Sequence, residues 1–285
     1  MLSAKQIGQY HTEGYLSLPD LVDPDWVRKL VNAASEFVER SRALAKSDGV
    51  IDIEPDHSAD NPRLRRLINP ADQHQVFAEF VLEGPPASIA TQLLGGPVRF
   101  HHSKLNYKWS DGGQAVEWHQ DIQYWPHSDF SPLTIGIYLD DVDIEMGAMG
   151  VVPQSHNGEL FDLYDGDQWT GSIHPNDLSR SGYQDAVWLT GPAGSVTVHN
   201  CCTVHGSPPN NTTTVRPLLL QTYSAVHSYP LLGVGTNGRT GRLSGTIIGG
   251  PRPRTLTVQG REMVAAPDWS RGGYSTIFDS QTGKD

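Results

Sequence analysis

Two histidines and one aspartate have the types and the spacing of a metal site. His119 and Asp121 are separated by one residue, and His205 lies much further along the chain. Alternate residues of an extended strand point to the same side, so His119 and Asp121 can face one ion while Gln120 faces away. Two imidazoles and one carboxylate hold non-heme Fe(II) and leave its other coordination positions open. The pattern therefore predicts an iron site.

Arg216 follows His205 closely enough to act at the same site. The segment between them contains Pro208-Pro209 and Asn210-Asn211, which are residues typical of a turn. A hairpin centred between the asparagines would place His205 opposite Arg216, with Cβ atoms roughly 5 Å apart. A guanidinium there can bind one carboxylate of a small keto-diacid through two parallel hydrogen bonds, while the other end chelates the metal. This geometry suits 2-oxoglutarate.

An isolated His-x-Asp triplet is weak evidence for a metal site. A second triplet, His127-Ser128-Asp129, lies between Pro126 and Pro132, in a stretch expected to be a loop. The first triplet gains its weight from the distal His205 and Arg216. The alternative is that all these polar groups are structural.

These motifs resemble those of the phytanoyl-CoA dioxygenase (PhyH) family of Fe(II)/2-oxoglutarate oxygenases. The similarity extends from Gly14 to about Ala225. It includes Lys108 before a Gly-containing loop, His119-Gln120-Asp121, Tyr124, Gly147–His156, Gly194-Ser195-Val196, His205-Gly206-Ser207 and Arg216. One departure is Gln154, because the family prefers glycine at that position of the turn.

The resemblance implies that His119, Asp121 and His205 hold Fe(II) and that Arg216 binds the cosubstrate, 2-oxoglutarate. The implied reaction also uses O2, releases succinate and carbon dioxide, and oxidises a C–H bond of the substrate. Hydroxylation is the expected outcome, with desaturation, epoxidation and ring closure left open. Ascorbate is expected to stimulate the reaction.

The resemblance also suggests further contacts for the cosubstrate. Gln120 and Ser207 match positions that assist its binding in the family, and Tyr138 matches a position that is often aromatic. Lys104 shares a strand face with Lys108, so Lys104 is a candidate contact for the cosubstrate or the substrate.

The substrate is expected to be a small-molecule metabolite, in natural-product biosynthesis. Three alternatives remain open. The chain could be an acyl-CoA hydroxylase of the same family, a 2-oxoglutarate-independent metalloenzyme of the cupin type, or a jelly roll that binds a metabolite without catalysis. Arg216 argues against the second alternative.

Composition narrows the class of protein. The net charge is −11 and no cluster of Lys or Arg stands out, so neither nucleic acid nor a membrane is an expected partner. The first residues lack the apolar core of a secretory signal.

The two cysteines, Cys201 and Cys202, are adjacent and unsuited to a disulfide framework, which fits a reducing cytoplasm. The oligomeric state stays open between monomer and homodimer.

The fold class expected is α+β, with an all-β core. The 29 Gly and 20 Pro suit short strands joined by turns. We expect a double-stranded β-helix (a cupin-like jelly roll) with N-terminal helices packed on one face. Residues 1–285 are expected to form a single domain. It comprises a mainly helical part (1–97), a jelly-roll core (98–225) with an insertion (157–183), and a loop-rich tail (226–285).

Residues 45–69 are polar and broken by prolines, which predicts an irregular excursion. This segment carries Arg63, Arg65 and Arg66. They are expected to form a solvated positive face or, alternatively, a contact for an anionic substrate.

Overall fold

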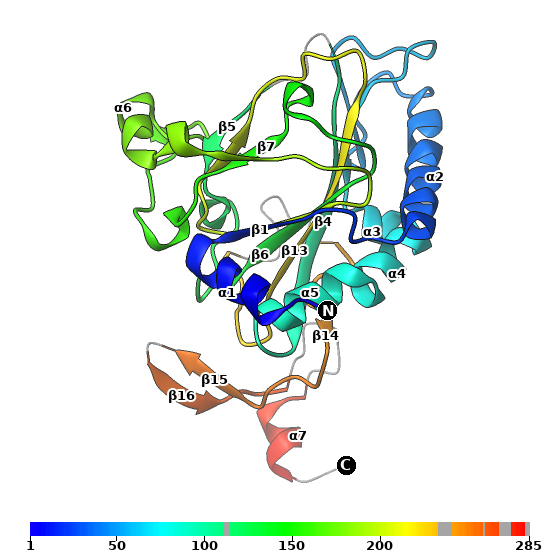
Figure 1. Cartoon of the computed structure of the whole chain (residues 1–285). Helices are drawn as coiled ribbons and strands as arrows, with labels where there is room; N and C mark the ends of the chain where they lie inside the picture. The colour runs from blue at the N-terminus through cyan, green and yellow to red at the C-terminus, as the bar shows by residue number, and fades with distance from the viewer. Residues whose placement is uncertain (111–114, 233–240, 259, 268–274, 283–285) are drawn as a thin grey trace. The chain divides into compact units, whose positions relative to one another are not determined.

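Two antiparallel sheets form the centre of this computed structural model, which describes residues 1–110, 115–232, 241–258, 260–267 and 275–282 (Figure 1). The larger sheet has the order β1-β11-β6-β13-β4-β3-β2, with β14 also paired to β4. Its strands are β1 (Tyr15–Leu18), β2 (Ile51–Ile53), β3 (Leu64–Ile68), β4 (Val98–Lys108), β6 (Leu133–Tyr138), β11 (Val196–Asn200), β13 (Arg216–Ala225) and β14 (Ile247–Ile248).

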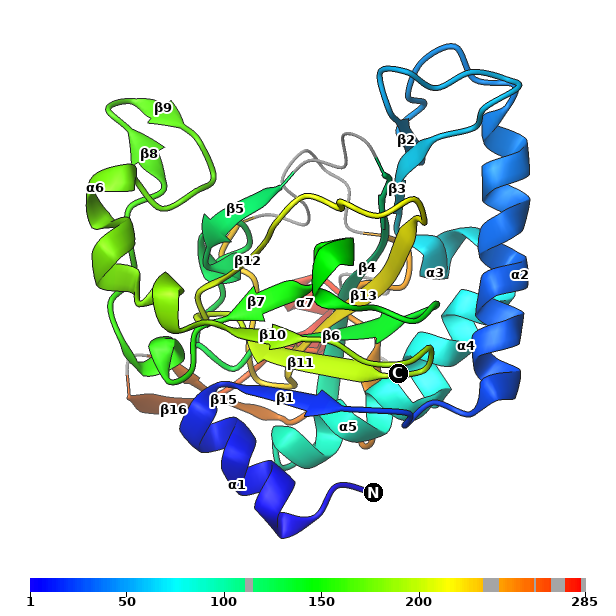
Figure 2. The ribbon, with the colours of Figure 1, turned by 45° about the horizontal axis from the view of Figure 1, so that its top comes forward.

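The smaller sheet has the order β10-β7-β12-β5. Its strands are β5 (Val116–His119), β7 (Met149–Val151), β10 (Val187–Leu189) and β12 (His205–Ser207). Figure 2 shows these strands on one side of the larger sheet and the helix α2 (Pro24–Ser41) on the other. This arrangement confirms the predicted jelly roll.

The N-terminal helices cover the outer face of the larger sheet. Besides α2 they are α1 (Ala4–Glu13), α3 (Pro70–Gln73), α4 (Gln75–Glu83) and α5 (Pro85–Leu93). Asp23 caps α2 by accepting a hydrogen bond from the Asp25 N–H, and Pro24 occupies the first turn. One apolar cluster joins helix residues such as Phe80 to sheet residues such as Leu105. Each such buried side chain contributes ~1.5–3 kcal/mol.

The strand β13 separates this apolar core from the interior of the jelly roll. Its residues alternate between two covered faces, so nearly all of them are buried. Leu219 belongs to the helix-side core, whereas Leu218 and Leu220 line the interior. Across β4, the partners of Leu218 and Leu220 are Asn106 and Lys104, which therefore face the interior too.

The predicted irregular excursion is wrong in part, because residues 45–69 contain β2 and β3. The β3 residues Leu64 and Leu67 are fully buried, while Arg65 and Arg66 between them are at least partly exposed. Arg63, before β3, is largely buried. Each arginine forms an ion pair within the segment, and none lines the interior cavity; the pairs are Arg63–Asp56, Arg65–Glu54 and Arg66–Asp52. Edge strands rich in charged residues give a weak apolar pattern, which explains the error.

The predicted hairpin between His205 and Arg216 is also wrong. His205 lies in the smaller sheet, opposite His119 of β5. Arg216 lies in the larger sheet, opposite Lys108. The segment 208–215 therefore crosses from one sheet to the other. Its conformation is held by Asn210, whose side-chain amide donates to the main chain of Lys108 and Thr214.

The insertion 157–183 contains short elements that the sequence did not predict. They are β8 (Tyr164–Asp165), β9 (Gln168–Trp169), α6 (Pro175–Leu178) and a 3-10 turn at Ser179–Ser181. Strands of two residues are too short to show any periodicity.

The tail predicted from residue 226 begins later in the structure. The chain divides into two compact units, Met1–Pro251 and Arg252–Asp285, so β14 belongs to the first unit. The second unit contains a hairpin of β15 (Thr255–Val258) and β16 (Arg261–Val264), and the helix α7 (Ile277–Thr282). Parts of the predicted tail, 233–240 and 268–274, lie outside the described residues.

Tyr223 joins the larger sheet to the helices through one buried hydrogen bond. Its hydroxyl donates to the carbonyl of Val81, in the last turn of α4, at 2.6 Å. We expect Tyr223→Phe to lower the free energy of unfolding by about 1–2 kcal/mol, because the carbonyl is left buried without a donor. Chemical denaturation measures this, with the exposed Tyr164→Phe as control. Equal stability of both variants would contradict the assignment.

Candidate metal and cosubstrate site

Two imidazoles present unprotonated nitrogens to the interior of the jelly roll. The Nδ1 atoms of His119 and His205 lie 2.7 Å and 2.9 Å from the carbonyl oxygens of Glu117 and Thr203. Since a carbonyl only accepts, each Nδ1 carries the hydrogen. Burial lowers the pKa of both rings, so both are neutral. Each Nε2 therefore offers a lone pair.

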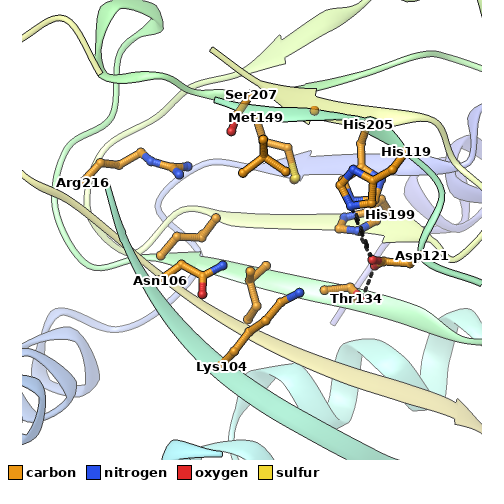
Figure 3. Close-up of a pocket in the computed structure, with 14 residues that line it drawn as sticks. Lys104, Asn106, His119, Asp121, Thr134, Met149, His199, His205, Ser207 and Arg216 are labelled. Carbon is orange, nitrogen blue, oxygen red and sulfur yellow. Dashed lines mark hydrogen bonds and ion pairs between the residues drawn. The ribbon is translucent and has the colours of Figure 1, made fainter. Parts of the chain in front are cut away.

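The Asp121 carboxylate completes this set of donors. Its Oδ1 lies 3.8 Å from His119 Nε2 and 3.9 Å from His205 Nε2. Its Oδ2 accepts hydrogen bonds from Thr134 Oγ1 at 3.2 Å and His199 Nε2 at 3.3 Å (Figure 3). Burial alone would raise the pKa of Asp121, but the His199 hydrogen bond and nearby positive charges hold it well below its usual range. The carboxylate is thus ionised and oriented.

The arrangement fits a divalent metal ion. One ligand atom from each of His119, Asp121 and His205 lies within 4.8 Å of the others. Two lone pairs and an ionised oxygen converge with no hydrogen between them, which a bound cation resolves. In the described part of the chain, no second group of three His, Cys, Asp or Glu residues has this geometry. A face of two histidines and one carboxylate favours Fe(II) with open positions.

The three candidate ligands line a cavity that is partly open to solvent, with about 470 Å³ of empty space when the solvent at its mouth is included. Apolar walls come from Met149, Leu218 and Leu220, and Arg216 lies at the end away from the histidines (Figure 3). The Nε and Nη1 atoms of Arg216 are buried and lack a hydrogen-bond partner in the described structure. A buried guanidinium without a partner is costly, so this end of the cavity is suited to an anion.

Lys108 lies opposite Arg216 on β4 and directs a neighbouring hydroxyl. Its ammonium group donates to Ser207 Oγ at 2.6 Å and to the carbonyl of Pro208 at 2.5 Å. Burial, assisted by the charge of Arg216, lowers the pKa of Lys108 to about 7. Because an ammonium only donates, Ser207 Oγ accepts here, and its own hydrogen is free to bind an anion in the cavity. Ser207 lines the cavity, as its predicted role requires.

The predicted contact between Gln120 and the cosubstrate is not supported. Gln120 is fully buried and does not line the cavity. Its Nε2 donates to the carbonyls of Glu159 (3.0 Å) and Cys202 (2.7 Å), and its Oε1 accepts from the Phe161 N–H (3.0 Å). The side chain points away from the ligands, as strand alternation requires, and joins β5 to the insertion 157–183.

Tyr138 is also absent from the residues that line the cavity. It is fully buried, its hydroxyl donates to the Leu189 carbonyl, and burial raises its pKa to about 12. The predicted cosubstrate contact at Tyr138 therefore lacks a free hydroxyl. Lys104, the last predicted contact, does line the cavity.

The sequence analysis missed three polar residues of the cavity, His199, Thr134 and Asn106. His199 and Thr134 are cross-strand partners on β11 and β6, so both reach Asp121 from the larger sheet. Asn106 shares its strand face with Lys104, and this alternation was the one signal that could have revealed it.

Gln154, the departure from the family pattern, adopts a left-handed backbone conformation. Its φ is +64°, in the region that favours glycine. Its N–H donates to the carbonyl of Glu13 at 2.8 Å. The turn thus keeps the shape that a glycine would give, with a non-glycine residue that costs about 1 kcal/mol.

Comparison with known proteins identifies the class. The model of the family described as Phytanoyl-CoA dioxygenase (PhyH) matches residues 10–218. A "Probable alpha-ketoglutarate-dependent hypophosphite dioxygenase" of Stutzerimonas stutzeri is 32% identical over 82% of this chain and 83% of its own length. An "L-proline trans-4-hydroxylase" of Streptomyces griseoviridis is 31% identical over 78% of this chain and 86% of its own length.

Solved structures agree with this class. EctD from S. alaskensis with bound Fe superposes with a TM-score of 0.68 and 27% identity, covering 79% of this chain and 77% of that one. EctD with 2-oxoglutarate and 5-hydroxyectoine gives a TM-score of 0.70 and 25% identity, covering 86% of each chain. The fold and the donor set are those of an Fe(II)/2-oxoglutarate-dependent dioxygenase.

This chain belongs to the phytanoyl-CoA dioxygenase (PhyH) family. It is an oxidoreductase that uses Fe(II) and 2-oxoglutarate. Among the residues that the structure describes, no helix has the length and apolar character needed to span a membrane.

The position of Gln120 allows a test between a structural role, in which it holds the insertion 157–183, and the predicted contact with 2-oxoglutarate. We expect Gln120→Met to lower the free energy of unfolding by about 2–4 kcal/mol, since three buried main-chain groups lose their partners. Proteolysis within 157–183 should accelerate, while the affinity for 2-oxoglutarate in the remaining folded protein should not change. Gln168→Met, on the exposed hairpin of the same insertion, is the control. Selective loss of 2-oxoglutarate affinity would instead restore the cosubstrate role.

Proposed function

We propose that the enzyme oxidises a C–H bond of a small-molecule metabolite, with iron held by His119, Asp121 and His205. In this proposal Arg216 binds the distal carboxylate of 2-oxoglutarate. One observation carries it: unprotonated donors converge at one end of a cavity, and a buried guanidinium without a partner lies at the other.

The bound iron and 2-oxoglutarate supply the oxidising power, and with O2 they yield succinate, carbon dioxide and the oxidised substrate. The protein's own residues orient the reactants. Thr134 and His199 fix Asp121, so that its Oδ1 faces the two imidazoles. Ser207, directed by Lys108, offers a hydrogen to the carboxylate beside Arg216. The apolar walls limit the access of water.

Small substrates are supported by the names of the relatives, which act on hypophosphite, ectoine and L-proline. The cavity joins a few polar groups to apolar walls, which is the usual lining of a small-molecule site. A role in natural-product biosynthesis and a cytoplasmic location stay predictions from the sequence. The acyl-CoA alternative is disfavoured, because this acidic chain has no obvious basic patch for the phosphates of CoA.

The metal assignment is tested by spectroscopy and by product formation. Anaerobic addition of 2-oxoglutarate to the Fe(II)-loaded protein should give a visible charge-transfer band, and aerobic incubation should form succinate. His119→Ala should abolish both signals, because one donor is lost. The exposed His11→Ala should retain them. Retention of both signals in His119→Ala would refute the assignment.

The role of Arg216 is tested separately. We expect Arg216→Met to weaken 2-oxoglutarate binding about a hundredfold, because one carboxylate of the ligand loses its charged partner. Iron content should stay at the wild-type level. Titration of the charge-transfer band measures the affinity, and Arg28→Met, with an exposed side chain, is the matched control. Unchanged affinity in Arg216→Met would place the distal carboxylate elsewhere.

A further inference from the structure

Lys104 is a cation in the cavity that the proposed chemistry leaves without a partner. It extends from β4 toward the side of the cavity where Asp121 lies (Figure 3). In the described structure its ammonium group makes no hydrogen bond and no ion pair within 4 Å, and it lines the cavity. By contrast, Lys108 on the same strand face donates to Ser207 and Pro208.

Asp121 makes no ion pair with Lys104, although the Lys104 charge is one of those that lower the pKa of Asp121. The Asp121 Oδ1 faces the Nε2 atoms of the two candidate histidine ligands, and its Oδ2 accepts from Thr134 and His199. Asp121 is the one acidic residue among those that line the cavity in the described structure. Lys104 therefore forms no direct contact with a carboxylate among the residues that line the cavity in the described structure.

The charges of the loaded site do not balance without a further anion. The two positive charges of Fe(II) offset the two negative charges of 2-oxoglutarate, and Asp121 offsets Arg216. Lys104 is left as one uncompensated positive charge, and Lys108 has the same sign when protonated. A positive charge without an anionic partner on the wall of this cavity attracts an anion, so the loaded site is suited to an anionic second ligand.

The cosubstrate does not account for Lys104. In the proposed arrangement one end of 2-oxoglutarate chelates iron and the distal carboxylate binds Arg216, so both of its carboxylates are used. Lys104 lies on the metal side of Asn106, and Arg216 lies beyond Asn106 on the other side (Figure 3). That position suits the substrate, which must be close to the iron to react.

Asn106 gives independent evidence for a polar ligand. Its Oδ1 is buried and has no hydrogen-bond partner in the described structure, although the residue lines the cavity. Asn106 and Lys104 are on the same face of β4, two residues apart, opposite Leu218 and Leu220. A charged group and an unpaired amide thus lie together on an otherwise apolar wall. Because Oδ1 only accepts, the amide must turn its Nδ2 toward the cavity to donate to an oxyanion there.

We propose that the substrate carries a small oxyanion, a carboxylate or a phosphorus oxyanion, which binds Lys104 with Asn106 beside it. This inference rests on the proposed function and names its substrate class. Lys104 is then a determinant of substrate specificity and takes no part in holding iron or 2-oxoglutarate.

The test uses the Fe(II)-loaded full chain with saturating 2-oxoglutarate, without oxygen and at constant ionic strength. Acetate and hypophosphite are titrated as the two kinds of oxyanion, with acetamide as the neutral comparator. We expect a saturable change of the charge-transfer band and a rise in the melting temperature with either or both oxyanions, and neither with acetamide. Lys104→Met and Lys104→Gln should weaken the response at least about tenfold.

Two controls accompany these variants. Lys104→Arg should recover part of the response, because it keeps the charge, and the exposed Lys46→Met should behave as the wild type. All variants should bind 2-oxoglutarate with unchanged affinity. Unfolding curves for each Lys104 variant confirm that any loss of response is not a loss of folding.

Three outcomes of the oxyanion titrations would overturn the inference. They are an absence of any saturable response to the oxyanions, an equal response to acetamide, and a wild-type response in both neutral Lys104 variants. Loss of 2-oxoglutarate affinity in those variants would also overturn it, since Lys104 would then serve the cosubstrate. A wild-type protein without the charge-transfer band would contradict the proposed function itself, which is a separate failure.

Discussion

The burial of an ionised carboxylate between two neutral imidazoles is the constraint on which the rest of the site depends. Asp121 is almost inaccessible to solvent, and its Oδ1 faces two nitrogens that carry no hydrogen. Such a cluster is unfavourable in an apolar interior unless a cation joins it. The smaller sheet supplies His119 and His205, and the larger sheet supplies the groups that hold Asp121. The metal site therefore requires both sheets in register.

The same two-sheet construction separates the metal end of the cavity from its cationic end. Arg216 and Lys108 face each other across β13 and β4, and the chain between His205 and Arg216 links the two sheets. Placing two cations side by side disfavours folding unless an anion arrives, and their repulsion contributes to the low pKa of Lys108. In the proposed function, this arrangement lowers the stability of the empty protein and raises its affinity for the acidic cosubstrate.

Local rules predicted a large part of this structure. The sequence predicted an all-β core with N-terminal helices on one face, and the two sheets and the helices α1 to α5 have that arrangement. Alternation placed His119 and Asp121 together, although β5 ends at His119 and Asp121 begins a 3-10 turn. That placement depends on residues adjacent in sequence, for which side-chain direction follows from the backbone alone.

Features that depend on tertiary pairing were not predictable in this way. The turn residues between His205 and Arg216 suit a hairpin and a crossing between sheets equally well, and only the partners of β12 and β13 decide between them. At Gln120, two signals in the sequence disagreed with each other. Alternation directed it away from the metal, and family similarity suggested a cosubstrate contact, but its amide is engaged by the main chain.

That engagement bears on how enzymes of this fold diversify. Gln120 holds the insertion through two main-chain groups, the carbonyl of Glu159 and the N–H of Phe161. Any residue can supply these groups, except that proline at position 161 would lack the N–H. The hydrogen bonds of Gln120 therefore do not depend on which side chains the insertion carries. Substitutions in the insertion 157–183 can therefore change its side chains while β5 and the metal site beside it keep their positions.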